Sequence, residues 1–140
     1  MDYRRFGNTI VVRMDRDEEI VEQVRALAQQ EHIRLAAVQA LGAVNDFTVG
    51  VFNTETKVYG SNRFQGPYEI VSLTGTIDTM DGNFYTHLHM SAGDADGKVF
   101  GGHLNRAVVS ATCEMIVTVI DGQVDRAFSQ EIGLNLFRFN

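Results

Sequence analysis

The sequence predicts an α+β fold, a single domain with a mainly antiparallel central sheet and one principal amphipathic helix packed on it. Two observations lead to this prediction. Most apolar residues fall in short segments rich in branched and aromatic side chains, with turn residues between them, and only one segment has helical periodicity. The chain has 140 residues, of which 44% are hydrophobic. Residues 1–140 should therefore form one domain that buries about two-thirds of its unfolded surface.

The predicted helix covers residues 15 to about 30. Its apolar positions follow the i, i+4, i+7, i+8 pattern of one helix face, and they are Ile20, Val24, Leu27 and Ala28. Asp15 is the expected N-cap, and Glu18 three residues later fits a variant of the capping box. The acidic residues at 17–19 would also be favourably placed in the positive first turn.

Short strands are predicted on both sides of this helix. They cover residues 10–12, 36–41, 47–52, 68–77, 84–91, 99–104, 114–120 and 134–139. Asp81-Gly82 and Asp121-Gly122 are dipeptides typical of hairpin turns, and residues 94–97 can close a further hairpin. Nothing resembles a linker, a repeat or a low-complexity tail, which favours one domain.

Three of the four histidines lie in one predicted hairpin. Residues two apart in a strand point to the same face, so His87 and His89 should project side by side. A two-residue turn at 81–82 would pair Thr76 with His87 and Thr74 with His89. The returning strand brings His103 to the same face if it pairs with either His89 or His87, and both pairings are sterically acceptable.

Three neutral imidazoles on one face suit a divalent transition metal with one coordination position left open. Zinc is the first choice, while nickel, copper, iron and cobalt stay open. Thr74 and Thr76 are candidates for orienting the rings. Gly101 and Gly102 indicate a bulge or a close approach by a ligand or a neighbouring chain. The alternative is that the histidines are only partly exposed polar residues of a strand.

Other candidate sites are weaker. Residues 94–97 resemble the start of a calcium loop, but the glycine and glutamate that such a loop needs later are missing. Cys113 lies in an apolar segment, which favours a buried inert thiol over a nucleophile. Glu114 is a candidate general base, whereas Glu69 should lie on the face opposite His87. His32 follows the helix and is expected to be solvated or to interact with the helix dipole.

Charge and apolar patterning argue against several classes of protein. Twelve basic and eighteen acidic residues give a net charge of −6, which disfavours non-specific nucleic-acid binding unless a local basic patch or a partner supplies the contact. No apolar run approaches the roughly 20 residues needed to cross a membrane. The single cysteine allows no internal disulfide, and no signal-peptide run follows the basic start, so a cytoplasmic location is expected.

The order of four motifs resembles the prokaryotic branch of the PPC family, the plants-and-prokaryotes-conserved domain. The motifs are Leu41-Gly42-Ala43-Val44, the segment 68–77 (Y-E-I-V-S-L-T-G-T-I), His87-Leu88-His89 and Gly101-Gly102-His103-Leu104. This resemblance implies an α+β fold, a homotrimer, and a metal, usually zinc, held by His87, His89 and His103. Plant relatives join the domain to a basic R-G-R-P motif that binds DNA, and this chain has no such motif.

Three hypotheses about function follow. The first is a cytosolic homotrimer with a three-histidine metal site whose open position takes water or a small ligand, and it leaves open whether the site is catalytic. The second is a DNA-binding or transcription-associated regulatory module in which the metal is only structural. The third is a small-molecule sensor in which the metal holds a ligand that carries a carboxylate.

Overall fold

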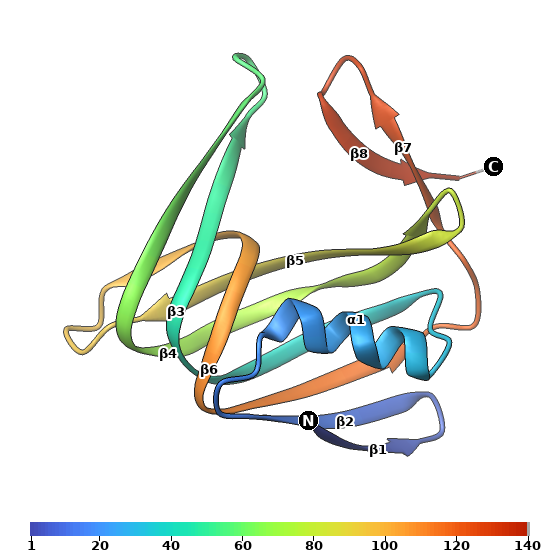
Figure 1. The fold of residues 1–140 in the computed structure, drawn as a ribbon. Coiled ribbons are helices and arrows are strands. Elements are labelled where there is room, and N and C mark those ends of the chain that lie inside the picture. Colours follow the sequence, from blue (N-terminus) through green and yellow to red (C-terminus); the bar gives the residue numbers. More distant parts are fainter. Residues whose placement is uncertain (140) are drawn as a thin grey trace.

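A six-stranded antiparallel sheet with one helix against it dominates the structure, a computed structural model that describes residues 1–139 (Figure 1). The elements in chain order are β1 (Asp2–Phe6), β2 (Thr9–Asp15), α1 (Ile20–Gln30), β3 (Ala36–Asn53), β4 (Val58–Met80), β5 (Asn83–Gly93), β6 (Val99–Val119), β7 (Asp125–Ser129) and β8 (Leu134–Arg138). The sheet order is β1-β2-β6-β3-β4-β5, and β7 and β8 form a separate hairpin. This arrangement agrees with the predicted α+β class.

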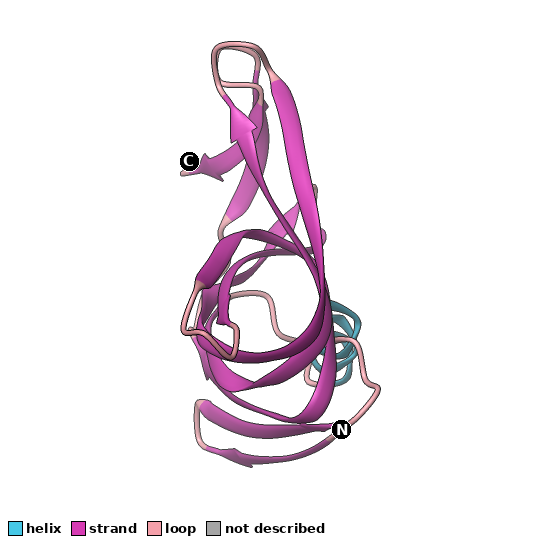
Figure 2. Cartoon of the chain, turned by 90° about the vertical axis from the view of Figure 1, so that its left-hand side faces the viewer, coloured by secondary structure: helices cyan, strands magenta, loops and turns pink. Residues whose placement is uncertain are grey.

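The sheet closes on itself because β5 pairs with β6 as well as with β4. Strands β3, β4, β5 and β6 thus form a continuous ring, which Figure 2 shows nearly end-on. The two long strands β3 and β4 also extend beyond the ring as a hairpin that projects on the same side as β7 and β8 (Figure 1). Closure leaves fewer free strand edges than an open sheet would have.

Helix α1 begins five residues later than predicted. Asp15 is the last residue of β2, and Glu19 is the N-cap, with its carboxylate accepting the backbone N–H groups of Val21 and Glu22. Glu18 does accept the N–H of Asp15, at 2.8 Å. That bond belongs to the turn between β2 and α1, so Asp15 is not the N-cap that the sequence predicted. The four apolar positions predicted for one helix face are all buried.

Several predicted strands are parts of longer ones. Segments 36–41 and 47–52 both belong to β3, and segments 99–104 and 114–120 both belong to β6. Register shifts near Gly42 and Val44 interrupt the alternation of β3 without ending it. Strands β1 and β7 were not predicted. The dipeptide Asp121-Gly122 leads from β6 into β7, which pairs with β8, so within residues 1–139 it does not close a hairpin.

The core is one cluster of buried side chains contributed by α1 and by strands β2 to β6. Its largest fully buried side chains include Phe47, Ile10, Met14, Leu73 and Met115. Burial of this size is the dominant stabilising term for a domain of this length. No helix in the described part of the chain is long and apolar enough to cross a membrane.

Candidate metal centre

The turn between β4 and β5 sets the positions of two histidines. Asp81 and Gly82 both have positive φ, 52° and 76°, as a type I′ turn requires. The two-residue loop pairs Met80 with Asn83, and counting outward places Thr76 opposite His87 and Thr74 opposite His89. The register predicted from the Asp-Gly dipeptide is therefore confirmed.

The turn between β5 and β6 brings in the third histidine. His89 pairs with His103, which is the first of the two registers that the sequence left open. Asp94 holds the loop closed, since its carboxylate accepts the N–H groups of Asp96 and Lys98, each at 2.9 Å. Its role is therefore that of a turn residue.

Gly101 and Gly102 allow neighbouring strands to approach His103 closely. A Cβ on Gly102 would lie 2.5 Å from the carbonyl oxygen of Gly50, and one on Gly101 would lie 2.8 Å from that of Met90. Both glycines pair in regular register with β5, and the bulge of β6 lies beyond His103, where Thr48 pairs with Arg106 while Val49 pairs with Leu104. Strands of the same chain thus account for both glycines.

The three imidazoles form one cluster. Nε2 of His87 lies 3.2 Å from Nε2 of His89, and the ring centroids lie 5.0 to 5.8 Å apart. One ring nitrogen from each histidine lies within 4.8 Å of the others. Zinc binds imidazole nitrogen at about 2.0 to 2.1 Å, so small ring rotations would bring all three nitrogens to one cation. This donor set fits the metal that the sequence predicts.

The surroundings of His87 and His103 favour the neutral form of these two rings, which is the form that binds metals. Burial lowers the pKa of His87, and the charge of His103 lowers it further. Burial also lowers the pKa of His103, with His89 adding to the effect. His89 is exposed, while His87 and His103 are half-buried. The cluster is thus open to solvent on one side.

Two tyrosine side chains lie near the histidine cluster. Tyr59 lies edge-on to His103, with 6.1 Å between ring centroids, and its hydroxyl donates to Oδ1 of Asn105 at 2.6 Å. Tyr85 precedes His87 by two residues on β5 and so lies on the same face. Asn135 donates to the hydroxyl of Tyr85 from β8. The cluster therefore has aromatic neighbours from β4 and β5.

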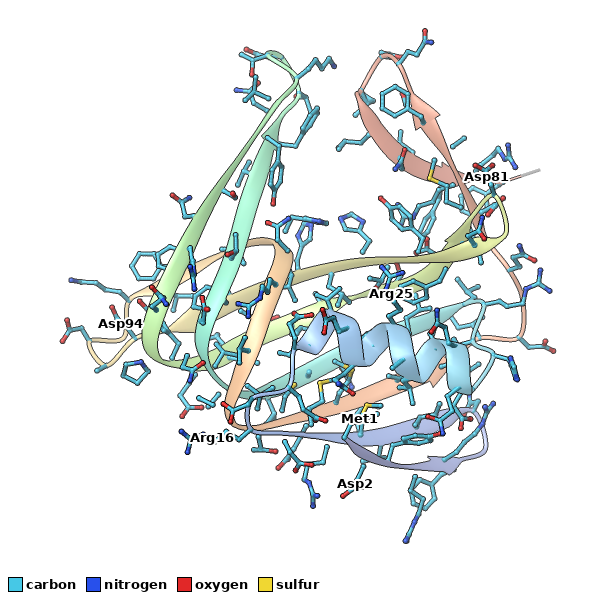
Figure 3. All side chains as sticks on the ribbon, viewed as in Figure 1. Met1, Asp2, Arg16, Arg25, Asp81 and Asp94 are labelled. Carbon is cyan, nitrogen blue, oxygen red and sulfur yellow. The ribbon has the colours of Figure 1, made fainter. Side chains whose placement is uncertain are left out.

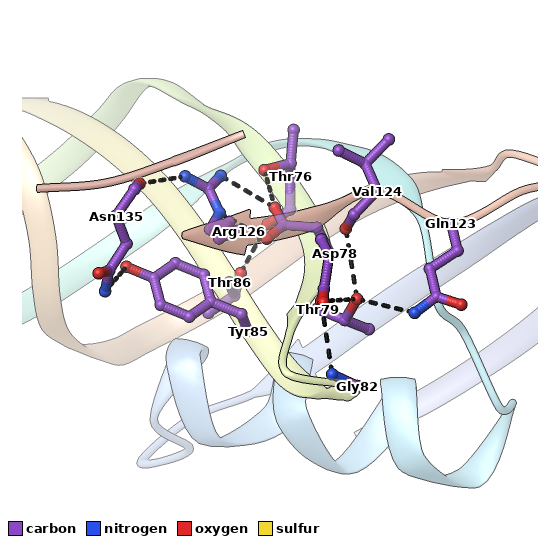
Figure 4. Close-up of polar contacts among 11 residues, drawn as sticks. Thr76, Asp78, Thr79, Gly82, Tyr85, Thr86, Gln123, Val124, Arg126 and Asn135 are labelled. Carbon is purple, nitrogen blue, oxygen red and sulfur yellow. Dashed lines mark hydrogen bonds and ion pairs between the residues drawn. The ribbon is translucent and has the colours of Figure 1, made fainter. Parts of the chain in front are cut away.

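A buried ion pair behind the cluster was not predicted (Figure 4). Arg126 of β7 donates to both carboxylate oxygens of Asp78 at 2.6 and 3.0 Å, and the two residues are 5% and 0% exposed. The guanidinium lies against the rings of Tyr85 and Phe137, 4.8 and 4.3 Å from their centroids. This pair attaches the β7–β8 hairpin to β4, the strand next to the one that carries His87 and His89.

The predicted role of the two threonines receives no support from the contacts. The hydroxyl of Thr76 donates to Asp78 at 2.6 Å. Within residues 1–139, neither Thr74 nor Thr76 hydrogen-bonds a histidine ring. Thr76, which pairs with His87 across the β4–β5 ladder, hydrogen-bonds the carboxylate of the ion pair instead.

The remaining candidates lie outside the cluster. Cys113 is fully buried, and burial raises the pKa of its thiol to about 12, which agrees with an inert residue. Glu114 pairs with Arg13 and Leu41 on exposed parts of the sheet. His32 lies at the end of α1 with a positive φ of 53°. In the described part of the chain, no carboxylate joins the three histidines.

Comparison with known proteins gives the same family as the motifs. Residues 1–121 match the family model of the Plants and Prokaryotes Conserved (PCC) domain, also abbreviated PPC. None of the curated proteins matches the chain at a significant level.

Three crystal structures show the same fold over nearly all of the chain. A protein of Bacteroides thetaiotaomicron, provisionally named a DNA-binding protein, has a TM-score of 0.96 at 30% identity, with 99% of this chain and 96% of that chain covered. A metal-containing protein of Archaeoglobus fulgidus has a TM-score of 0.89 at 31% identity, with 99% of each covered. A PPC protein of Pyrococcus horikoshii has a TM-score of 0.85 at 27% identity, with 99% and 94% covered. The chain belongs to the Plants and Prokaryotes Conserved domain family.

Proposed function

We propose that this chain is a cytoplasmic, homotrimeric metal-binding domain that holds a divalent cation, zinc in the first place, on His87, His89 and His103. The observation that carries the proposal is the convergence of three ring nitrogens within 4.8 Å on one open face. The metal-containing relative from Archaeoglobus fulgidus, 31% identical over 99% of both chains, adds support. We assign no reaction, because no carboxylate of residues 1–139 joins the rings as a general base.

Three protein ligands leave a coordination position free. Zinc bound in this way supplies a Lewis-acid position that takes water or an oxygen atom of a small ligand. The protein's own contribution is to hold the rings in place, through the two tight turns and the His89–His103 pairing. Water or a ligand would reach the metal from the solvent, past the exposed side chain of His89.

The proposed trimer has a physical rationale in exposed apolar residues. The projecting hairpins carry Val51, Val58, Phe128 and Phe139, which are 60 to 77% exposed. Apolar groups gathered on projecting hairpins are typical of surfaces that another chain covers. Light scattering coupled to size exclusion tests this, and a mass of three times the 15.6 kDa chain is expected. A monomer mass would contradict the trimer.

Metal analysis tests the site itself. Protein purified without a histidine tag, and supplied with zinc during growth, should carry about one metal per chain. The double variant His87→Ala/His89→Ala should lose it, while His32→Asn should keep it because His32 lies outside the cluster and asparagine tolerates its positive φ. Equal metal content in the double variant and the parent would remove the proposal.

A second candidate is a DNA-binding or transcription-associated module in which the metal is only structural. The provisional name of the Bacteroides relative favours it. The net charge of −6 argues against broad phosphate contact. A DNA titration at two salt concentrations distinguishes the candidates, since phosphate contact should weaken steeply as salt rises. Unchanged DNA mobility at micromolar protein would dismiss this candidate.

A further inference from the structure

A cavity opens next to His103, where β5 and β6 separate. Their ladder begins at the pair His89–His103 and runs away from the β4–β5 turn. Before that pair the two strands diverge, and α1 crosses the gap. The space left between α1, β5 and β6 has a volume of about 280 Å³, and His103 is among the residues that line it. His103 is the member of the histidine cluster that lines it, so the cavity adjoins the proposed metal centre at this residue.

Arg25 of α1 supplies a positive charge to this cavity. Its guanidinium carbon lies 5.0 Å from the centroid of the Phe84 ring on β5. Figure 3 shows Arg25 between α1 and β5. Within residues 1–139 no carboxylate lies at ion-pair distance from Arg25, whereas Arg63, Arg106 and Arg126 all have one. Stacking on a ring leaves the N–H groups at the guanidinium edge free to bind an anion.

Backbone groups of β5 add further donors. In a two-residue hairpin the residues flanking the turn exchange hydrogen bonds, and the pattern then alternates. Met80–Asn83 is such a pair here, so Phe84 and Thr86 direct their N–H and C=O groups away from β4. Both residues line the cavity and lie beyond the end of the β5–β6 ladder. Their N–H groups thus point toward the cavity side of the strand.

Asn105 contributes an amide near the histidine end. Its Oδ1 accepts the hydroxyl of Tyr59 at 2.6 Å, which leaves the NH₂ group to donate elsewhere. Asn105 is the extra residue of the β6 bulge that follows His103. The bulge therefore places a donor next to the proposed metal centre.

We propose that this cavity binds a small dicarboxylic acid, with one carboxylate on Arg25 and an oxygen of the other end at the metal. The proposal rests on the metal centre proposed above and names the class of ligand that would use its open position. The guanidinium of Arg25 gives the cavity a positive charge, and with the backbone N–H groups and the amide it matches a carboxylate. A volume of about 280 Å³ lies at the small end of ligand sites, so a ligand of few heavy atoms is expected.

Cobalt(II) in place of zinc makes ligand binding visible, because its absorption spectrum changes with coordination. The cobalt-loaded protein is titrated with acetate and with the straight-chain dicarboxylates from malonate to adipate. At least one dicarboxylate should bind about 10- to 100-fold more tightly than acetate, as expected for a hydrogen bond to a charged group. In Arg25→Met this advantage should disappear while acetate binding stays the same.

Arg16→Met is the matched control, because Arg16 is exposed and lies away from the cavity. It should keep the full preference for the dicarboxylate. Equal affinities for acetate and every dicarboxylate in the parent would overturn the inference, and so would an equal loss in Arg25→Met and Arg16→Met. Failure of the parent to bind cobalt at all would instead overturn the metal centre, and the inference with it.

Discussion

Replacing Arg126 with leucine should strongly destabilise the fold. Its guanidinium bonds both oxygens of Asp78 at 2.6 and 3.0 Å, and neither side chain has more than 5% of its surface exposed. The variant would leave the Asp78 carboxylate buried without a countercharge. Removing one partner of a buried pair typically costs about 3 to 5 kcal/mol. Loss of the contacts with Tyr85 and Phe137 acts in the same direction.

Urea unfolding at one fixed protein concentration measures this cost, since stability depends on concentration if the chain assembles. A thermal midpoint lower by on the order of 6 to 20 °C is expected for a chain of this size. The double variant Asp78→Leu/Arg126→Leu should recover much of the stability, because no buried charge is left. A single variant within about 1 kcal/mol of the parent, or a double variant less stable than the single one, would refute the reasoning.

Three further outcomes are expected. The hydrogen bond to Arg63 is the largest cause that lowers the pKa of Asp46 from 3.8 to about 2. The Asp46 carboxylate therefore stabilises the fold above about pH 4, and this stabilisation is lost as the pH falls toward 2. The difference in thermal midpoint between the parent and Asp46→Asn should therefore shrink over that interval, and a constant difference would contradict the assignment. Cys113 should resist a thiol reagent at pH 8 until urea unfolds the chain, and rapid labelling of the native protein would count against its burial. Gly102→Ala should lower the thermal midpoint, because its Cβ would meet the Gly50 carbonyl at 2.5 Å, whereas Gly60→Ala, with nothing within 4 Å, should leave it nearly unchanged.

The histidine cluster could be predicted because the information lies in neighbouring residues. Asp81-Gly82 determines the turn type, the turn determines the register, and the register determines the face on which His87 and His89 lie. The loop of Asp94 then limits His103 to one of two pairings. Turn type, register and strand face each depend on residues that are close together in the chain, so they could be predicted from the sequence.

The start of the helix was harder to predict, because the N-cap depends on a contact with a distant strand. Glu19 caps α1 and also accepts the N–H of Ala107 at 2.9 Å, while its backbone forms a bridge to Val108. Asp15 has the side chain of a good cap, but β6 holds it in β2 by pairing with it at Thr112. Tertiary pairing overrides the local preference here.

The groups that surround the histidines could not be found from the sequence, because they come from other elements. Arg126 is 48 positions from Asp78 in the chain, and nothing near either residue marks the other. Arg25 reads as a solvated residue on the polar side of a helix, and only the divergence of β5 from β6 places it at a cavity with His103. Local patterns thus identify three candidate metal ligands, whereas the charged groups around them depend on which elements the closed sheet brings together. Arg25 is exposed and has no carboxylate partner within residues 1–139, whereas Arg126 is buried and paired with Asp78. Variants of Arg25 should therefore test the proposed ligand site, and variants of Arg126 should test the stability of the fold.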